Sequence, residues 1–305
     1  MEETFGIMAN LFHYRGGDLL IHHSVSENPL AVSALPDMHV HEYHEVLYCI
    51  SGDCSFIVEG REYPLLPGSA MIMRPAEAHR VKINSNAAYE RIVINFPDSL
   101  IEGIDPQKLL LKPFWSRSQG SLNLHSSPRI RSIMEAQFAP LRNAPRGDET
   151  FQPHRDYEMR LSLLIGLLAF LKELNHEFSS LGQAAQGGAA AGRSELLDYV
   201  NEHLFDRELS VNMLKDKFYL SVSQLNRSFS RLTGATVREY VMAKRLIQAK
   251  LIIEAGRPAS EACEASCFKD YSTFYRAYRK RFLVPPVHTR KTSACVRDEP
   301  ADLEY

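Results

Sequence analysis

SVSQLNRSFSRLTG, residues 221–234, is the stretch that decides the fold of this chain. Ser221 followed three residues later by Gln224 is a capping box, which predicts that a helix begins at this point. Leu225 and Phe229 are four residues apart and predict the buried face of that helix. The other positions carry hydroxyl, amide and guanidinium groups, so we expect a polar exposed face. A short capped helix of this kind is typical of a helix-turn-helix unit.

The same pattern occurs a second time at residues 270–282, DYSTFYRAYRKRF. Asp270 is the predicted N-cap, and Phe274 and Tyr278 repeat the four-residue buried step. The side chains that we expect to face outward can hydrogen-bond to base edges and to phosphates. They are Ser221, Ser223, Gln224, Asn226, Arg227 and Arg231 in the first copy, and Tyr271, Ser272, Tyr275, Arg276 and Arg279 in the second.

A long helix is predicted between the two copies. Thr236 and Glu239 form another capping box, Gly256 is a typical helix end, and Pro258 prevents continuation. About 20 residues at ~1.5 Å each give a rod of roughly 30 Å. Since one turn of a DNA duplex is ~34 Å, two units on such a rod fit successive major grooves. A plain helical bundle with a solvated polar face would explain one capped unit but leaves the pair unexplained.

Charge is distributed unevenly along the 305 residues, although the net charge is only −2. Residues 194–292 contain 17 Lys and Arg against 11 Asp and Glu, a net charge of +6. Residues 1–193 carry −5 and residues 293–305 carry −3. A basic segment inside an acidic chain is typical of a nucleic-acid-binding domain.

Residues 194–292 resemble the DNA-binding domain of the AraC/XylS family of bacterial transcription regulators. The resemblance is carried by SVSQLNRSFSRLTG, REYVMAKRLIQAKLII and FKDYSTFYRAYRKRFLVPP. In the second motif, Cys267 and Leu283 replace two glycines that are usual in the family, and Ala262 and Cys263 stand where Ile-Ala is usual. The positions that match there are Phe268, Phe274, Phe282 and Pro286. The first motif is closer to the family pattern, so we expect the second unit to read DNA less strictly.

Residues 18–97 alternate apolar and polar side chains over short runs separated by turn signals, which predicts an all-β sandwich or barrel. This region contains HVHEYHE at residues 39–45, a dense set of metal-ligand types. Because alternate residues of a strand point the same way, His39 and His41 can share a face.

Residues 37–97 resemble the cupin-like sensor barrel that this family often carries. The resemblance implies a small-molecule effector, with a sugar or a small acid as candidates. We expect the effector to contact His39, His41, Glu45, Tyr48, Arg74 and His79. Metal-binding cupins use a similar pattern, so a divalent transition metal such as Fe(II), Mn(II), Ni(II) or Zn(II) is the alternative. Its ligands would be His39, His41, Glu45 and His79.

Three observations favour the organic effector over the metal, so we expect no cofactor. The segment from Pro75 to His79 is one residue shorter than the usual metal-cupin spacing. His44, directly before Glu45, offers a competing register. Regulators of the family commonly keep part of this residue set as the polar wall of an effector pocket.

The segment after the barrel is predicted to be helical. Tyr157, Leu161, Leu164, Leu168, Leu171 and Leu174 recur at three- and four-residue steps over residues 155–178, which predicts an amphipathic helix. Packing on its own domain and pairing in a dimer are both open. Residues 181–193 are small and glycine-rich, as in flexible linkers. The predicted parts are a cupin-like sensor domain (1–125), a helical dimerisation segment (126–180), the linker (181–193), an all-α DNA-binding domain with two helix-turn-helix units (194–292) and a disordered acidic tail (293–305).

The sequence therefore predicts a DNA-binding transcription regulator rather than an enzyme. The rival class is a cupin metalloenzyme with a helical appendage, which leaves the paired capped helices unexplained. Five cysteines without a CxxC pair indicate reduced thiols. No signal segment or membrane-spanning run is evident, so we expect a cytoplasmic bacterial protein on the nucleoid. Predicted partners are double-stranded DNA, the effector, a second copy of the chain and RNA polymerase.

Overall fold

The structure is a computed structural model that describes residues 8–16, 18–31, 38–118, 120–138, 141, 153–184 and 194–288. Its contacts divide the chain into two compact units. The first unit contains Met1–Leu35, Tyr43–Arg74 and Arg80–Ala190. The second contains Pro36–Glu42, Pro75–His79 and Ala191–Tyr305. Two short segments of the predicted barrel region thus belong to the second unit. The predicted tail lies outside the described residues, as does most of the predicted linker.

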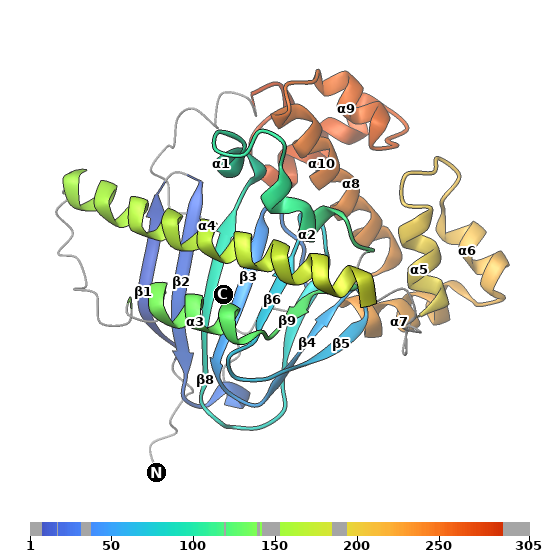
Figure 1. Cartoon of the computed structure of the whole chain (residues 1–305). Helices are drawn as coiled ribbons and strands as arrows, with labels where there is room; N and C mark the ends of the chain where they lie inside the picture. Colours follow the sequence, from blue (N-terminus) through green and yellow to red (C-terminus); the bar gives the residue numbers. More distant parts are fainter. Residues whose placement is uncertain are drawn as a thin grey trace, which may run out of the picture. The chain divides into compact units, whose positions relative to one another are not determined.

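Two sheets form the β-rich part of the first unit, as predicted (Figure 1). The larger sheet has the strand order β1-β2-β8-β3-β6-β9 and the smaller has the order β5-β4-β7. The strands are β1 Met8–Gly16, β2 Leu19–Ser26, β3 His44–Ser51, β4 Cys54–Val58, β5 Arg61–Leu65, β6 Ala70–Met73, β7 His79–Ile83, β8 Tyr89–Phe96 and β9 Leu124–His125.

Strand β3 illustrates why the larger sheet is buried on both faces. Successive side chains of a strand point to opposite sides. Val46 and Tyr48 belong to the hydrophobic cluster on one side, whereas Leu47 and Cys49 belong to the cluster on the other. The second cluster lies between the two sheets, because it also contains residues of β4 and β5.

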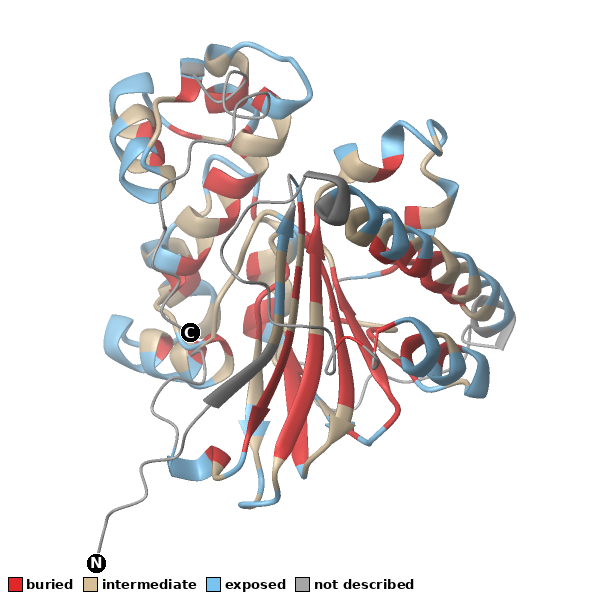
Figure 2. Cartoon of the chain, turned by 90° about the vertical axis from the view of Figure 1, so that its left-hand side faces the viewer, coloured by how far each residue is buried: buried red, intermediate tan, exposed pale blue. Residues whose placement is uncertain are grey.

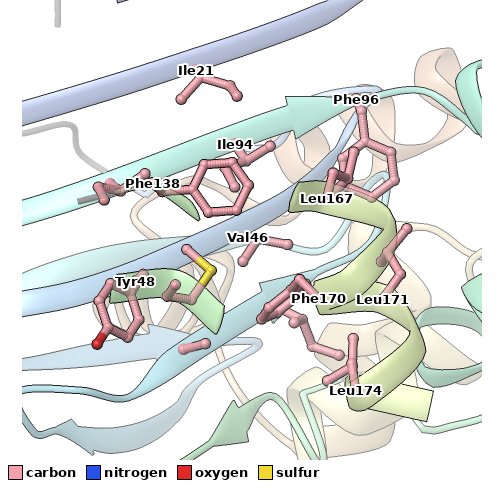
Figure 3. Packing of buried hydrophobic residues seen from close by; sticks show 14 of the residues in the cluster. Ile21, Val46, Tyr48, Ile94, Phe96, Phe138, Leu167, Phe170, Leu171 and Leu174 are labelled. Carbon is pink, nitrogen blue, oxygen red and sulfur yellow. The ribbon is translucent and has the colours of Figure 1, made fainter. Parts of the chain in front are cut away.

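Helices cover the other face of the larger sheet (Figures 1 and 2). They are α1 Asp98–Glu102, α2 Lys112–Trp115, α3 Pro128–Gln137 and α4 Pro153–Ala184, with a short 3₁₀ turn at Leu109–Leu111. Leu167, Phe170, Leu171 and Leu174 of α4 pack toward strand residues such as Ile94 (Figure 3). Each fully buried side chain of this size contributes roughly 1.5–3 kcal/mol, so α4 is a core element of the unit.

The predicted apolar stripe of α4 is wrong in part. Only Leu171 and Leu174 of its six residues are fully buried, whereas Tyr157 is 65% and Leu161 45% exposed. The buried face also includes Leu163, Leu167 and Phe170, which the predicted stripe omitted. The helix is apolar on more than one side, so its spacing alone allowed several registers. Packing against α3 selects one, because a Cβ on Gly166 would lie 3.0 Å from the Phe138 ring. The helix also extends beyond the predicted range of 155–178.

The described part of Ala191–Tyr305 is all-α, as predicted (Figure 1). Its helices are α5 Glu195–Glu202, α6 Val211–Phe218, α7 Val222–Thr233, α8 Val237–Glu254, α9 Ala259–Ala265 and α10 Tyr271–Phe282, followed by a 3₁₀ turn at Pro286–His288. One hydrophobic cluster joins α5, α6 and α7 to the start of α8, and another joins α9 and α10 to its end. Helix α8 is therefore shared by two small cores. No helix among the described residues is long and apolar enough to cross a membrane.

Helix α8 has the predicted start and end. The reciprocal capping box of Thr236 and Glu239 is present, and Gly256 follows the helix with a φ of 92°. Its 18 residues span ~27 Å at ~1.5 Å each. Arg245 fixes the surrounding loops by donating to the carbonyl oxygens of Leu204 at 2.8 Å and Cys267 at 3.1 Å. Helix α8 thus connects both small cores, and Arg245 ties a loop of each to it.

Candidate DNA-binding interface and effector site

Helix α7 is oriented by its cap and its buried side chains. The Ser221 hydroxyl accepts the Gln224 N–H at 3.3 Å, and the Gln224 side-chain oxygen accepts the Ser221 N–H at 2.9 Å. Leu225 and Phe229 are fully buried, as predicted. The opposite face exposes Ser221, Ser223, Gln224, Arg227 and Arg231. The side chains on this polar face carry hydrogen-bond donors that can pair with acceptor atoms of base edges in the major groove.

Asn226 differs from the other predicted DNA-contacting residues of α7. It is half-buried, and its side-chain oxygen accepts the Val237 N–H at 3.4 Å. This bond ties α7 to the first turn of α8. We therefore assign Asn226 a structural contact within the unit, and its predicted contact with DNA stays a prediction.

Helix α10 repeats the arrangement of α7. The Asp270 carboxylate accepts the Thr273 N–H at 2.7 Å, which confirms the predicted N-cap. Phe274 and Tyr278 are fully buried. The predicted residues that are exposed are Tyr271, Ser272, Arg276 and Arg279, whereas Tyr275 is half-buried.

The two positions where the sequence replaces family glycines have left-handed backbone. Cys267 has a φ of 57° and Leu283, which caps α10, has a φ of 59°. Gly234, the corresponding cap of α7, has a φ of 72°. Glycine is the residue that adopts this conformation without steric cost. The fold therefore keeps the glycine geometry in the second unit although the glycines are absent.

The space between the two sheets of the first unit has a row of polar side chains that sequence reasoning missed. Cross-strand partners share a face, and β2 pairs with β8 through His22↔Val93, Ser24↔Arg91 and Ser26↔Tyr89. Tyr89 belongs to the cluster between the sheets and Val93 packs against it, so their partners face it too. Strand β3 adds Glu45, which is paired with Asn95. The buried members are Ser24, Ser26, Glu45, Tyr89, Arg91 and Asn95.

Several polar atoms of this row have no hydrogen-bond partner among the described residues. They are the Ser26 hydroxyl, the Tyr89 hydroxyl and the side-chain oxygen of Asn95. A buried polar group without a partner costs about 1–3 kcal/mol. This cost favours a polar occupant, either water or a ligand, on the face between the sheets.

Burial shapes the ionisation of this row. The pKa of His22 is lowered to about 4, first by burial and then by the charges of His13 and Arg91. Burial raises the pKa of the Tyr89 hydroxyl. At neutral pH both side chains are therefore uncharged and can donate hydrogen bonds. Arg91 lies with its guanidinium carbon 4.8 Å from the centre of the Tyr89 ring.

The six predicted effector residues do not have common surroundings. Glu45 faces the space between the sheets, whereas Tyr48 faces the helices and donates to Glu135 at 3.4 Å. Burial and then the Glu135 charge raise the pKa of Tyr48 to about 12. Arg74 donates to the carbonyl oxygen of Arg117 at 3.1 Å. The prediction that Tyr48 and Glu45 line one pocket is wrong, because they are on opposite faces of β3.

The three remaining residues, His39, His41 and His79, belong to the second unit. Each offers a ring nitrogen, and these nitrogens all lie within 4.8 Å of one another. Glu45, the fourth predicted ligand, is not a member of this group among the described residues. The structure therefore brings together three of the four predicted metal ligands.

Comparison with known families supports both halves of this arrangement. Residues 31–152 match the model described as AraC-like ligand binding domain, and residues 214–292 match the model described as Helix-turn-helix domain. A ligand-binding β domain followed by paired helix-turn-helix units defines a class of protein, the ligand-binding transcription regulators.

Individual relatives belong to the same class. The chain is 25% identical to the HTH-type transcriptional activator RhaS of Citrobacter koseri over 84% of this chain and 87% of that protein. It is 22% identical to RhaS of an Enterobacter species over 88% of this chain and 93% of that protein. Among solved structures it is similar to ToxT from Vibrio cholerae (12% identity, 92% and 100% coverage, TM-score 0.34) and to the AraC-like activator CuxR (14%, 83% of each chain, TM-score 0.35).

The chain belongs to the AraC family of transcriptional regulators. It is a DNA-binding protein with an AraC-like ligand-binding domain, and it is a regulator rather than an enzyme.

Proposed function

We propose that a small polar effector binds on the face between the two sheets of the first unit and sets the affinity for operator DNA. The observation that carries this proposal is the set of buried polar atoms on that face that have no hydrogen-bond partner in the described part of the chain, above all those of Asn95 and Tyr89. A bound ligand that supplies those partners recovers the cost of leaving them unsatisfied.

The chemistry of the row indicates the effector class. Arg91 supplies a cationic donor, Glu45 an anionic acceptor, and Asn95 an amide that both donates and accepts. Sugar hydroxyl groups need donors and acceptors together, so a small polyhydroxylated molecule fits the row best. A small carboxylic acid is the second candidate, because Arg91 can bind a carboxylate through two parallel hydrogen bonds.

A thermal-shift screen of the full chain with sugars and small carboxylic acids tests this proposal. We expect a hit from either class to raise Tm by an amount that grows with the logarithm of ligand concentration above Kd, as binding to the folded state requires. Asn95→Leu and Arg91→Met should abolish the shift, whereas Glu62→Gln, on an exposed part of β5, should keep it. A hit whose shift survives both substitutions would place the effector elsewhere.

For DNA we propose that α7 and α10 enter major grooves through their exposed faces. Arg227 and Arg276 are assigned to base edges, and Ser221 and the other exposed hydroxyl and guanidinium groups to phosphates. Phosphate contacts release counterions, so the affinity should fall steeply as salt is raised. Such a regulator would act on the bacterial nucleoid, in the cytoplasm, and contact RNA polymerase if it activates.

We also propose that the exposed apolar side of α4 pairs with a second copy of the chain. Tyr157, Leu161 and Ile165 lie on successive turns and are 65%, 45% and 54% exposed. An apolar stripe of this kind on a long helix is suited to helix pairing. Sedimentation equilibrium should show a dimer that Leu161→Glu dissociates. The same charge placed at exposed Lys172 of this helix should leave the dimer intact, and a Leu161→Glu dimer would contradict the proposal.

A further inference from the structure

The cluster of His39, His41 and His79 is built by backbone pairing of two segments. The N–H of His39 donates to the carbonyl oxygen of His79 at 3.1 Å, and the N–H of His79 donates back to His39 at 3.1 Å. The N–H of Ala76 donates to the His41 carbonyl oxygen at 2.9 Å. The ring centres are 4.4 Å apart for His39 and His79, and 5.0 Å apart for His41 and His79.

The orientation of His79 is that of a metal ligand. Its Nδ1 lies 2.7 Å from the carbonyl oxygen of Glu77, and a carbonyl can only accept, so Nδ1 carries the proton. The lone pair is then on Nε2. Metal-binding histidines commonly use one nitrogen in this way to fix the tautomer that presents the other to the ion. His79 is fully buried, whereas His39 and His41 are half-buried.

The residues that alternate with the histidines pack on helices of the same unit. Met38 and Val40 are packed against the hydrophobic cluster that contains Leu225 and Phe229 of α7, and Ala78 is a member of that cluster. The contact with Met38 is close, since a Cβ on Gly234, at the end of α7, would lie 2.5 Å from the Met38 Cβ.

Charged side chains also attach the segment that contains His39 and His41 to the helices. Glu42 forms an ion pair of 2.6 Å with Lys250 of α8, and both side chains are largely buried. Arg281 of α10 donates to the carbonyl oxygen of Val40 at 2.9 Å. Residues 38, 40 and 42 thus contact α7, α8 and α10, while 39 and 41 turn to the histidine cluster.

We propose that His39, His41 and His79 bind one divalent transition-metal ion, and that this ion stabilises the contact of their two segments with α7, α8 and α10. Three imidazoles suit Zn(II), Ni(II), Co(II) or Cu(II). Nitrogen ligands lie ~2.1 Å from such an ion, so small ring rotations bring the three nitrogens into range. The inference goes beyond the proposed effector, because it concerns another unit and does not require the organic ligand.

Metal binding is tested on the untagged full chain after treatment with a chelator. Titration with Co(II) should produce a visible d–d absorption band that saturates at one equivalent, and Zn(II) should displace it. Zn(II) in ~100-fold excess over its Kd should raise Tm by about 5 °C. The absence of a stoichiometric band and of a Tm shift would overturn the proposal.

Variants locate the ion. His39→Ala/His41→Ala should lose the band and the Tm shift, whereas His176→Ala, an exposed histidine of α4, should keep both. If the double variant fails to fold, the single His41→Gln, at a half-buried position, answers the same question. A band that is unchanged in a folded His41→Gln or double variant would place the metal elsewhere.

The coupling to the helices is tested by loosening a contact between the docked segment and α8 that the three histidines do not themselves make. Binding linkage is reciprocal, so a substitution that weakens the docked segments must weaken the metal. We expect Lys250→Met to reduce the Co(II) affinity about fivefold or more. Lys215→Met, on α6, where the lysine side chain is 44% exposed, should not change it. Equal affinities in the two variants would overturn the coupling.

Discussion

Helices α7 and α10 have the same length of 12 residues and the same four-residue buried step, but the turns around them differ. Helix α7 begins with a reciprocal capping box and ends at Gly234. Helix α10 begins with the single cap of Asp270 and ends at Leu283. Both C-caps are left-handed, and so is Cys267 in the turn before α10.

The residue types at the two C-caps differ, whereas their backbone conformation is the same. The left-handed caps are kept in both units, so the geometry of the turn is a requirement of the fold. A side chain with a Cβ costs roughly 1–2 kcal/mol in that conformation. Tyr219, in the turn before α7, is also left-handed, with a φ of 53°. The first unit therefore has one such non-glycine residue and the second has two, so we expect the second to be the less stable half of the domain.

Removal of one large core side chain from each half gives the largest effect. Phe229→Ala and Phe274→Ala should each cost about 3–5 kcal/mol, because both rings are fully buried. The two belong to separate clusters, so amide hydrogen exchange should increase mainly in the half that is changed. Because of its additional strain, the second half should open more in Phe274→Ala than the first half does in Phe229→Ala. Equal opening of both halves in either variant would contradict the view of two small cores.

Arginines on the two exposed faces give an intermediate effect. Arg227→Ala and Arg276→Ala should each weaken operator binding by about 1–3 kcal/mol and relax base choice at one position. Fluorescence anisotropy on operators changed one base pair at a time measures both quantities. Arg257→Ala, at an exposed arginine outside α7 and α10, is the control. An affinity that falls equally on all sequences would reassign the arginine to phosphate.

Substitutions at the two helix C-caps give the smallest changes in stability, and the two changes have opposite signs. Leu283→Gly should stabilise the chain by about 1 kcal/mol by removing the left-handed strain. Gly234→Ala should destabilise it by at least about 1 kcal/mol, since the new Cβ also meets Met38. Urea denaturation measures both. A Leu283→Gly variant that is less stable than the parent would contradict the comparison.

The sequence predicted the parts of the structure that depend on neighbours along the chain. The caps at Ser221, Thr236 and Asp270 and the buried steps of α7 and α10 are local, so they were found. The apolar side of α4 was only partly found, because a helix that is apolar around most of its circumference does not indicate which side a sheet will cover.

The effector site was harder to predict, because it depends on strand pairing. Glu45 and Tyr48 are three positions apart on one strand, and an odd separation puts them on opposite faces, so this error was avoidable. His22, Arg91 and Asn95 were missed because only the pairing of β2, β8 and β3 brings them onto one face. His79 was matched to His39 and His41 through the family resemblance, and the structure confirms that the three lie together.

Selection of bound duplexes from a randomised DNA pool tests the central claim most directly. The full chain, with Arg227→Ala/Arg276→Ala as its control, is used at a fixed salt concentration. We predict an enriched sequence with two short conserved blocks about one helical turn apart, lost in the double variant. No enrichment, or the same enriched sequence in both proteins, would contradict the account of α7 and α10 as the elements that read DNA.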